Sequence, residues 1–355
     1  MSQFWSETAR CLSPYVPGEQ PRVVDLIKLN TNEHPLAPAN SVLAAIANLE
    51  AEGLRRYPDP QAMLLRQAIA SAEGLSPAQV FVGNGSDEVL AHAFQALLKQ
   101  SQPLLLPDIT YSFYQVWAQL YGIELTMTPL ADDFSIDIDA LCASSGPIIM
   151  ANPNAPTGLA VNLEQIERLL RSDLNRLVVV DEAYFGFGAQ SAATLINQFE
   201  NLLVTRTLSK SHALAGLRVG YALGHHELIE GLTRVKDSFN SYPIDAVAQV
   251  AAQAAVEDSA WFSSASAVVV KNRDALVTGL ERLGFAVLPS AANFVFTKHE
   301  TLPGSQIFTA LRDRNILVRR WDQPRIDNYL RITVGTAAQV DALLRVLAAV
   351  IDERD

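Results

Sequence analysis

Several polar side chains follow apolar runs of the sequence, at positions where they could bind an anion or act as a nucleophile. Residues 202–221 read LLVTRTLSKSHALAGLRVGY, and a polar turn within this segment contains Thr207, Ser209 and Lys210. Ligands of parallel sheets usually bind at the strand ends, so a lysine just past a buried strand is a candidate reactive amine. Arg218, at the end of the same segment, adds a second cation.

A glycine-rich turn, GNGSDE at residues 83–88, follows the apolar run QVFV and continues into a predicted helix. The free N–H groups of Gly85, Ser86 and Asp87 would point outward at the positive end of the helix dipole. Such a turn can bind an anion. Taken alone it is also consistent with an ordinary capped turn, in which Ser86 or Asp87 is the N-cap.

Asp181 ends the run LVVVD and is therefore expected to be at least partly buried. A buried carboxylate is unfavourable unless a cation or hydrogen-bond donors meet it. We therefore expect a positively charged partner for Asp181.

These residues need a scaffold, and the pattern from Gln79 onward alternates short apolar runs with helical periods. This alternation is typical of βα units and predicts an α/β fold with a mainly parallel sheet covered by helices. The predicted strands are QVFV, PLLL, IELTM, PIIMA, LVVVD, LLVT and RVGYAL, and the clearest predicted helices cover residues 87–100, 111–121 and 163–171.

The remaining sequence predicts a second, smaller α+β domain. The first thirty residues are rich in proline and read as an arm, whereas a long helical stretch up to Leu283 connects to four short strands and two helices. A length of 355 residues also favours two domains. We predict a large domain at 30–258 and a small one formed by 1–29 plus 259–355.

The composition favours small-molecule chemistry. A formal charge of -11 and a pI near 5.1 argue against a nucleic-acid surface or an anionic membrane. Cys11 and Cys142 lack the spacing of a disulfide framework or a zinc site. No export signal or long apolar span is visible, so a cytoplasmic protein is expected.

Nine short motifs occur together along nearly the whole chain. In order they are LNTNEHP, RRYPDP, GNGSDE, DITYSFY, NPNAPTG, DEAYFGF, TRTLSKSHALAGLRVGY, SAANF and LRITVGT. As a set they resemble the fold-type-I pyridoxal-phosphate aminotransferases, and most closely the histidinol-phosphate aminotransferase branch. This resemblance implies a large domain with a seven-stranded sheet, pyridoxal 5'-phosphate as the cofactor, and a homodimer.

The resemblance also implies a role for individual residues. Lys210 is similar to the lysine that forms a Schiff base with the cofactor, Asp181 to the partner of its ring nitrogen, and Tyr184 to the tyrosine that binds its phenolic oxygen O3′. Tyr111 resembles the aromatic residue that stacks on the ring. The other expected cofactor contacts are Gly85, Ser86, Asp87, Asn154, Thr207, Ser209, Arg218 and, from the neighbouring subunit, Tyr57.

The substrate residues implied by the resemblance are Arg331 for an α-carboxylate, Arg319 with Arg320 for a phosphate, and Tyr15 and Asn32 in substrate-facing loops. The implied reaction is amino transfer from L-histidinol phosphate to 2-oxoglutarate, in histidine biosynthesis. A threonine-phosphate decarboxylase or an aromatic amino-acid aminotransferase has the same fold and stays an alternative. Transcription regulators of this fold need a DNA-binding domain, which we do not expect because the motifs begin by Asn30.

One position departs from many relatives of this family. They have an asparagine directly before Pro-Thr-Gly that donates to O3′, whereas this chain has Ala155. Either Asn152 or Asn154 replaces it, or Tyr184 is the only donor. We favour Tyr184 alone, because an alanine cannot donate and neighbouring residues of an extended segment point to opposite sides.

Overall fold

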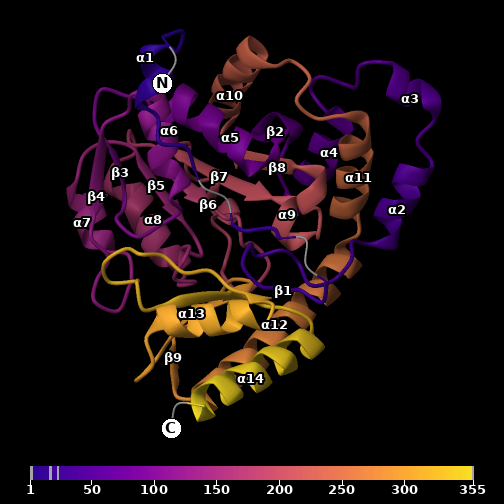
Figure 1. Ribbon diagram of the computed structural model, residues 1–355. Helices are drawn as coiled ribbons and strands as arrows, with labels where there is room; N and C mark the ends of the chain where they lie inside the picture. Colours follow the sequence, from indigo (N-terminus) through magenta and orange to yellow (C-terminus); the bar gives the residue numbers. More distant parts are fainter. Residues whose placement is uncertain (1–2, 16–17, 22–23, 354–355) are drawn as a thin grey trace.

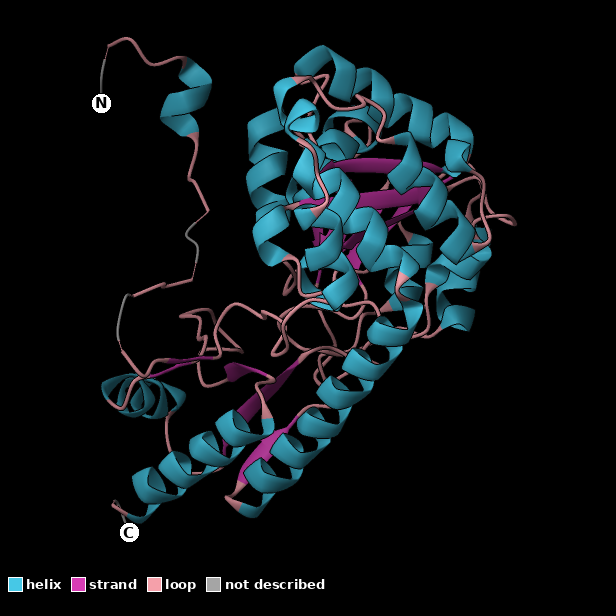
Figure 2. Ribbon diagram, turned by 90° about the vertical axis from the view of Figure 1, so that its right-hand side faces the viewer, coloured by secondary structure: helices cyan, strands magenta, loops and turns pink. Residues whose placement is uncertain are grey.

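The computed structural model describes residues 3–15, 18–21 and 24–353, which form two lobes with an extended N-terminal arm (Figures 1 and 2). A seven-stranded sheet lies at the centre of the larger lobe, in the order β2-β8-β7-β6-β5-β3-β4. Its strands are β2 (Val80–Asn84), β3 (Leu104–Pro107), β4 (Leu125–Thr128), β5 (Ile148–Ala151), β6 (Val178–Asp181), β7 (Leu202–Thr207) and β8 (Val219–Gly224).

The five neighbouring strands from β7 to β4 pair in parallel, whereas β8 is antiparallel to both β7 and β2. The predicted mainly parallel sheet is therefore confirmed, and all seven predicted strands are present. Every residue of β3, β5 and β6 is buried, as expected for strands that helices cover on both faces.

Successive side chains of each strand alternate between two apolar cores. Val178 and Val180 face one core, and Val179 faces the other. Helices with apolar residues at three-to-four spacing close each core. On the first face these are α2 (Asn40–Ala47), α4 (Met63–Glu73), α7 (Ile138–Ala143), α8 (Leu163–Ser172) and α11 (Ala246–Glu257); on the second they are α5 (Gly85–Ala93), α6 (Phe113–Tyr121) and α10 (His226–Phe239).

Two local differences from the predicted helices are clear. The helix predicted at 87–100 begins earlier, at Gly85, and its end is a wider π-helical turn at Phe94–Leu98. Helix α10 was not predicted, although Leu228, Ile229 and Leu232 have helical spacing and pack on the second core.

The smaller lobe lies below the larger one in Figure 2, and the long helix α12 (Ser259–Arg282) connects the two. It contains an antiparallel sheet of order β12-β10-β9 and the parallel pair β1-β11. The bounds are β1 (Ile27–Lys28), β9 (Phe285–Val287), β10 (Phe294–His299), β11 (Ile316–Leu317), β12 (Leu330–Thr333), α13 (Gly304–Asp313) and α14 (Ala337–Asp352). Leu29 packs in the core of this lobe with Leu276 and Leu343, which supports the predicted division into 30–258 and 1–29 plus 259–355. That division stays a prediction.

The described part of the N-terminal arm contains one short helix, α1 (Glu7–Cys11). After β1 the chain continues through α2 to the short helix α3 (Ala51–Arg55). The arm contacts both lobes. Gln119 of α6 donates to the Cys11 carbonyl over 2.6 Å, and Arg312 of α13 pairs with Glu19 over 2.9 Å. Among the described residues, no helix combines the length and apolarity needed to cross a membrane.

Candidate active site

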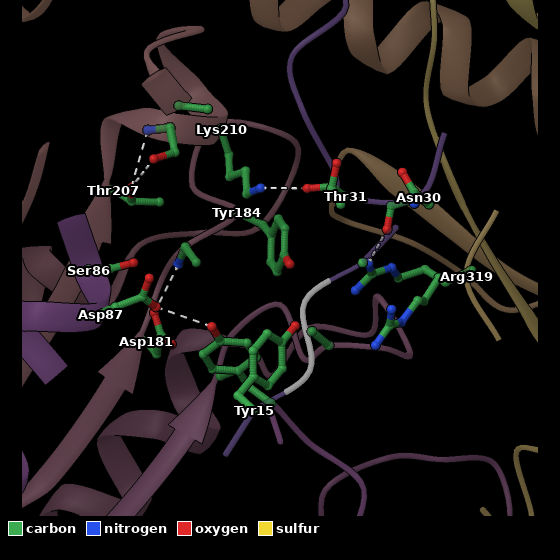
Figure 3. Close-up of a pocket in the computed structure, with 18 of the residues that line it drawn as sticks. Tyr15, Asn30, Thr31, Ser86, Asp87, Asp181, Tyr184, Thr207, Lys210 and Arg319 are labelled. Atoms are coloured by element: carbon green, nitrogen blue, oxygen red, sulfur yellow. Dashed lines mark hydrogen bonds between the residues drawn. The ribbon is translucent and has the colours of Figure 1, made fainter. Parts of the chain in front are cut away.

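A cavity opens where the carboxyl ends of β5, β6 and β7 meet the beginning of α5, and residues of the smaller lobe and the arm close its other side (Figure 3). This is the edge at which parallel sheets commonly bind ligands. The cavity is lined by Tyr15, Gly18, Asn30, Thr31, Ser86, Asp87, Tyr111, Ala151, Ala155, Asp181, Ala183, Tyr184, Thr207, Ser209, Lys210, Ala215, Arg218, Arg319 and Arg331.

Lys210 lies in α9 (Leu208–Ser211), the single helical turn that follows β7. Its Nζ donates to the Thr31 carbonyl over 2.7 Å, as drawn in Figure 3. Burial, with a further contribution from the positive charge of Arg331, lowers the pKa of Lys210 to about 8. The neutral, nucleophilic form of this amine is therefore more populated near neutral pH than that of an ordinary lysine.

Asp181 ends β6 and is 3% exposed. Its Oδ2 accepts from the Tyr114 hydroxyl over 2.7 Å, and its Oδ1 accepts from Thr205 and from the Ala183 amide, each over 3.2 Å. Burial raises the pKa of Asp181 to about 6, and the three hydrogen bonds oppose that rise. The expected positive partner is not a protein side chain, because the described contacts of this carboxylate are all to neutral donors.

The beginning of α5 forms an anion-binding cradle with β8 and Arg218. Gly85 starts the helix with φ 81, and a Cβ on Gly220 of β8 would lie 2.3 Å from the Ser86 amide nitrogen. Only glycine permits this conformation and this close approach. Arg218 reaches the same place, where it pairs with the Asp87 carboxylate over 3.1 Å.

Two hydroxyls complete this cradle. The Thr207 hydroxyl donates to Ser209 Oγ over 3.0 Å, and Arg218 donates to the same Oγ over 3.3 Å. Helix N–H groups, hydroxyls and a guanidinium together favour a phosphate group.

Aromatic side chains form the walls. Tyr111 lines the cavity and its hydroxyl donates to Asp87 over 3.2 Å. Tyr184 also lines the cavity and accepts at its hydroxyl from the Asn32 amide over 2.9 Å. Burial raises the pKa of Tyr184, although the charge of Arg331 opposes that rise. Tyr184 therefore stays a neutral phenol with a hydrogen available to donate.

Two arginines lie at the far end of the cavity. Arg319 and Arg331 are paired through their backbones, over 3.0 and 2.8 Å. One terminal nitrogen of Arg331 donates to the Asn30 carbonyl over 2.9 Å, whereas its buried Nε has no partner in the described part of the chain. A buried donor without an acceptor is unfavourable, so an anionic ligand would satisfy it. Tyr15 stands beside this end, stacked on Phe113 with ring centroids 4.8 Å apart.

Five predicted site residues are not among those that line this cavity: Gly85, which begins the helix of the cradle, and Asn154, Asn32, Arg320 and Tyr57. Asn154 uses both amide hydrogens on the Ile109 carbonyl and Thr157, and its oxygen accepts from Thr110. Both amide hydrogens are therefore engaged within the protein, which opposes a direct contact of Asn154 with a ligand; the contact stays a prediction. Asn152 is likewise engaged with the Val161 backbone, at 2.9 and 3.1 Å. Ala155 itself faces the cavity, which supports Tyr184 as the only donor at this point.

Asn32 lies behind Tyr184 instead of facing a substrate. It has φ 57, donates to Tyr184, and is held by Thr333 and Asn293 over 2.9 to 3.0 Å. Arg320 donates to Asp322 and to the Asp327 carbonyl, which opposes its predicted help with a phosphate.

Tyr57 is also remote from the cavity of its own chain. It is 82% exposed and stacks on Tyr242 with centroids 4.7 Å apart. Its predicted role requires a second subunit. Conversely, sequence reasoning missed Tyr114 as the partner of Asp181. The signal was present, since the motif YSFY places a second tyrosine one helical turn after Tyr111.

The comparisons with known proteins agree with this geometry. The family model described as Aminotransferase class I and II matches residues 24–347. The chain belongs to this aminotransferase family. It is 55% identical over 97% of its length to histidinol-phosphate aminotransferase 2 of Dechloromonas aromatica (strain RCB), of which it covers 98%. It is also 52% identical over 99% of its length to the histidinol-phosphate aminotransferase of Acetobacter pasteurianus, of which it covers 99%.

Among solved structures, the chain is similar to histidinol-phosphate aminotransferase from Sinorhizobium meliloti in complex with pyridoxal-5'-phosphate. That structure has a TM-score of 0.88 and 25% sequence identity, and the match covers 100% of this chain and 99% of the other. The fold is thus that of the fold-type-I aminotransferases, and the family's cofactor is pyridoxal 5'-phosphate.

The residues of the cavity fit this cofactor. The cradle at Gly85 and Gly220 offers donors that suit its phosphate. The described contacts of Asp181 include no cation, and the protonated ring nitrogen of the cofactor would supply one. Lys210 and Tyr184 line the space between them. No group of three or more His, Cys, Asp or Glu side chains in the described ranges could hold a metal ion.

Proposed function

We propose that this enzyme transfers the amino group of L-histidinol phosphate to 2-oxoglutarate, giving imidazole-acetol phosphate and L-glutamate. The observation that carries the proposal is that one cavity contains two sets of residues. Lys210 and the buried Asp181 suit pyridoxal phosphate, and Arg319 and Arg331 suit the anionic groups of the substrates. The identity of 55% over nearly the full length to a histidinol-phosphate aminotransferase supports the choice of substrate.

The bound cofactor supplies an aldehyde that accepts an amine and a ring that stabilises negative charge next to it. Lys210 provides the displaceable amine and, once free, a base for the substrate Cα proton, for which a pKa of about 8 is well matched. With the cofactor bound, Asp181 would accept a hydrogen bond from its protonated ring nitrogen, and Tyr184 would donate to its phenolic oxygen. Arg218 and the beginning of α5 hold the phosphate.

At the other end of the cavity, Arg331 holds the α-carboxylate of glutamate or 2-oxoglutarate, and Arg319 together with Tyr15 holds the phosphate of histidinol phosphate. The unpartnered Nε of Arg331 supports this assignment. A guanidinium can meet either anion through two parallel hydrogen bonds, which explains how one cavity accepts both substrates in turn.

A homodimer with shared sites forms part of this proposal. Tyr57 and Tyr242 stack on the surface, and nearby Leu54 is 65% exposed. Exposed aromatic and aliphatic groups in one place favour a protein partner. In a two-fold dimer, Tyr57 would reach the cofactor phosphate of the other subunit. We also propose that the enzyme acts in the cytoplasm.

The decisive experiment assays the purified enzyme for glutamate-linked turnover of L-histidinol phosphate, with carbon dioxide release from L-threonine phosphate measured in parallel. We expect amino transfer and no decarboxylation. Carbon dioxide release without amino transfer would support the lyase, and preference for aromatic amino acids would support the third alternative.

Two variants test the assignment of residues. Lys210→Ala should abolish turnover, and borohydride reduction of the native enzyme should fix the cofactor on Lys210 alone; labelling of Lys236 would contradict the site. Mixing inactive Lys210→Ala and Tyr57→Ala chains should restore part of the activity, since one site of the hybrid dimer keeps both residues. No recovery after demonstrated subunit exchange would contradict shared sites.

A further inference from the structure

Arg319 and Arg331 form an unusual pair of like charges. They lie opposite each other across an antiparallel backbone bridge, and both side chains line the cavity. Side chains directly opposite in such a pair lie close together on one face, where like charges repel. The structure must therefore hold the two guanidiniums in place by another contact.

Trp321 provides that contact. The guanidinium carbon of Arg319 lies 5.6 Å from the centroid of the Trp321 ring, and that of Arg331 lies 5.2 Å from it. Both distances are within the range of a cation–π interaction. Arg331 has a second aromatic neighbour, Phe294, at 5.4 Å.

An aromatic face stabilises a cation in a way that suits a binding site. A carboxylate would occupy the N–H donors of an arginine and compete with an incoming anion, whereas a ring interacts with the flat face of the guanidinium and leaves its edge free. One terminal nitrogen of Arg331 donates to the Asn30 carbonyl, but its buried Nε has no acceptor among the described residues and is still available.

The position of Trp321 is itself fixed by contacts that reach the larger lobe. Its ring meets Phe296 edge-on at 6.5 Å and packs against an apolar cluster that includes Phe134. Arg325, on the same loop between β11 and β12, donates to the carbonyls of Leu130 and Ala131 over 3.0 and 2.7 Å. The loop is thus anchored on two sides.

We propose that Trp321 is a positioning residue that holds Arg319 and Arg331 at the spacing needed for the anionic groups of both substrates. Trp321 does not line the cavity, so it acts only through the two arginines. This inference rests on the proposed function for the identity of the substrates. Loss of the ring should weaken anion binding and leave the proton transfers at Lys210 unchanged.

The test compares Trp321→Leu, which removes the aromatic face, with Trp321→Phe, which keeps a smaller one. Leu288→Ala is the matched control, because Leu288 packs against the same cluster but does not line the cavity. For each holoenzyme, kcat and KM are measured for L-histidinol phosphate and 2-oxoglutarate. The dissociation constant of glutarate, an unreactive dicarboxylate, is measured from the change it causes in the absorbance of the bound cofactor.

Two lost cation–π contacts should raise both KM values and the glutarate dissociation constant about 10-fold in Trp321→Leu, with kcat within about 3-fold of the native value. Trp321→Phe should be intermediate and Leu288→Ala close to native. Unchanged glutarate affinity in Trp321→Leu, or an equal loss in Leu288→Ala, would overturn the proposal. If the native enzyme bound glutarate but did not turn over histidinol phosphate, the proposed function would fail while the glutarate series still decided the role of Trp321.

Discussion

Tyr114→Phe tests the electrostatics of Asp181 without touching the cavity wall. Burial raises the pKa of Asp181 from the ordinary 3.8 to about 6. At 1.36 kcal/mol per pH unit, keeping this carboxylate ionised in the folded protein costs about 3 kcal/mol of folding free energy. The Tyr114 hydroxyl donates to it over 2.7 Å. A hydrogen bond to a charged group contributes about 1.5–3 kcal/mol, so its loss should raise the pKa of Asp181 further, by about 1–2 pH units.

The direction of the pH dependence follows from the higher pKa in the folded chain. Between about pH 4 and pH 6 the folded cofactor-free protein binds more protons at Asp181 than the unfolded chain does, so this group makes stability fall as pH rises through that window. In Tyr114→Phe the window should extend upward to about pH 7–8. Asp181→Asn should remove this component of the fall altogether.

The assay is urea unfolding of the cofactor-free proteins at one fixed protein concentration, at about pH 4.5 and about pH 8. Tyr114→Phe should lose about 1 kcal/mol relative to the native protein at the lower pH, where the hydrogen bond is between neutral groups, and about 2–3 kcal/mol at the higher pH. Equal losses at both pH values would show that Tyr114 acts only through packing, and would refute the electrostatic reasoning.

Three further outcomes are expected. Ala155→Asn should lower the pH midpoint of the bound cofactor's absorbance change by about 1 pH unit or more, because it adds a donor to the phenolic oxygen. Asn154→Ala should leave this midpoint nearly unchanged. The reverse result would identify Asn154 as the donor. Arg206→Ala should lower the free energy of unfolding by about 3–5 kcal/mol in thermal or urea unfolding, because Arg206 is 1% exposed and pairs with two carboxylates. A loss below about 1 kcal/mol, as expected for an exposed ion pair, would contradict this. Gly220→Ala should weaken the cofactor at least about 10-fold in equilibrium dialysis, because its Cβ would lie 2.3 Å from the Ser86 amide; native affinity would show that the cradle can yield.

The sequence predicted the sheet well because its signals are local. Strands such as LVVVD are short runs rich in apolar residues between helical periods. Asp181 ends one such run, and Lys210 lies three residues after the end of β7. Helix α10 has an equally local signal in the spacing of its apolar residues.

The errors concern side-chain direction within loops, which no local pattern specifies. Asn32 adopts φ 57 and is held by residues far away in the sequence, so its amide reaches Tyr184 instead of the cavity. The Asn154 side chain is hydrogen-bonded to the Ile109 carbonyl and the Thr110 hydroxyl. The contact of Trp321 with two arginines likewise depends on how the loop after β11 folds back, which spacing alone does not reveal.

The two sides of the cavity come from different parts of the chain, and this affects how the substrate specificity of such an enzyme can evolve. Groups suited to the cofactor stand on the rigid ends of β6, β7 and the beginning of α5, whereas the anion-holding arginines belong to β12 and the loop that precedes it. Substitutions in residues 319–329 can therefore explore new substrates while cofactor loading is retained. A combinatorial library confined to that loop would be the economical route to altered specificity on this scaffold.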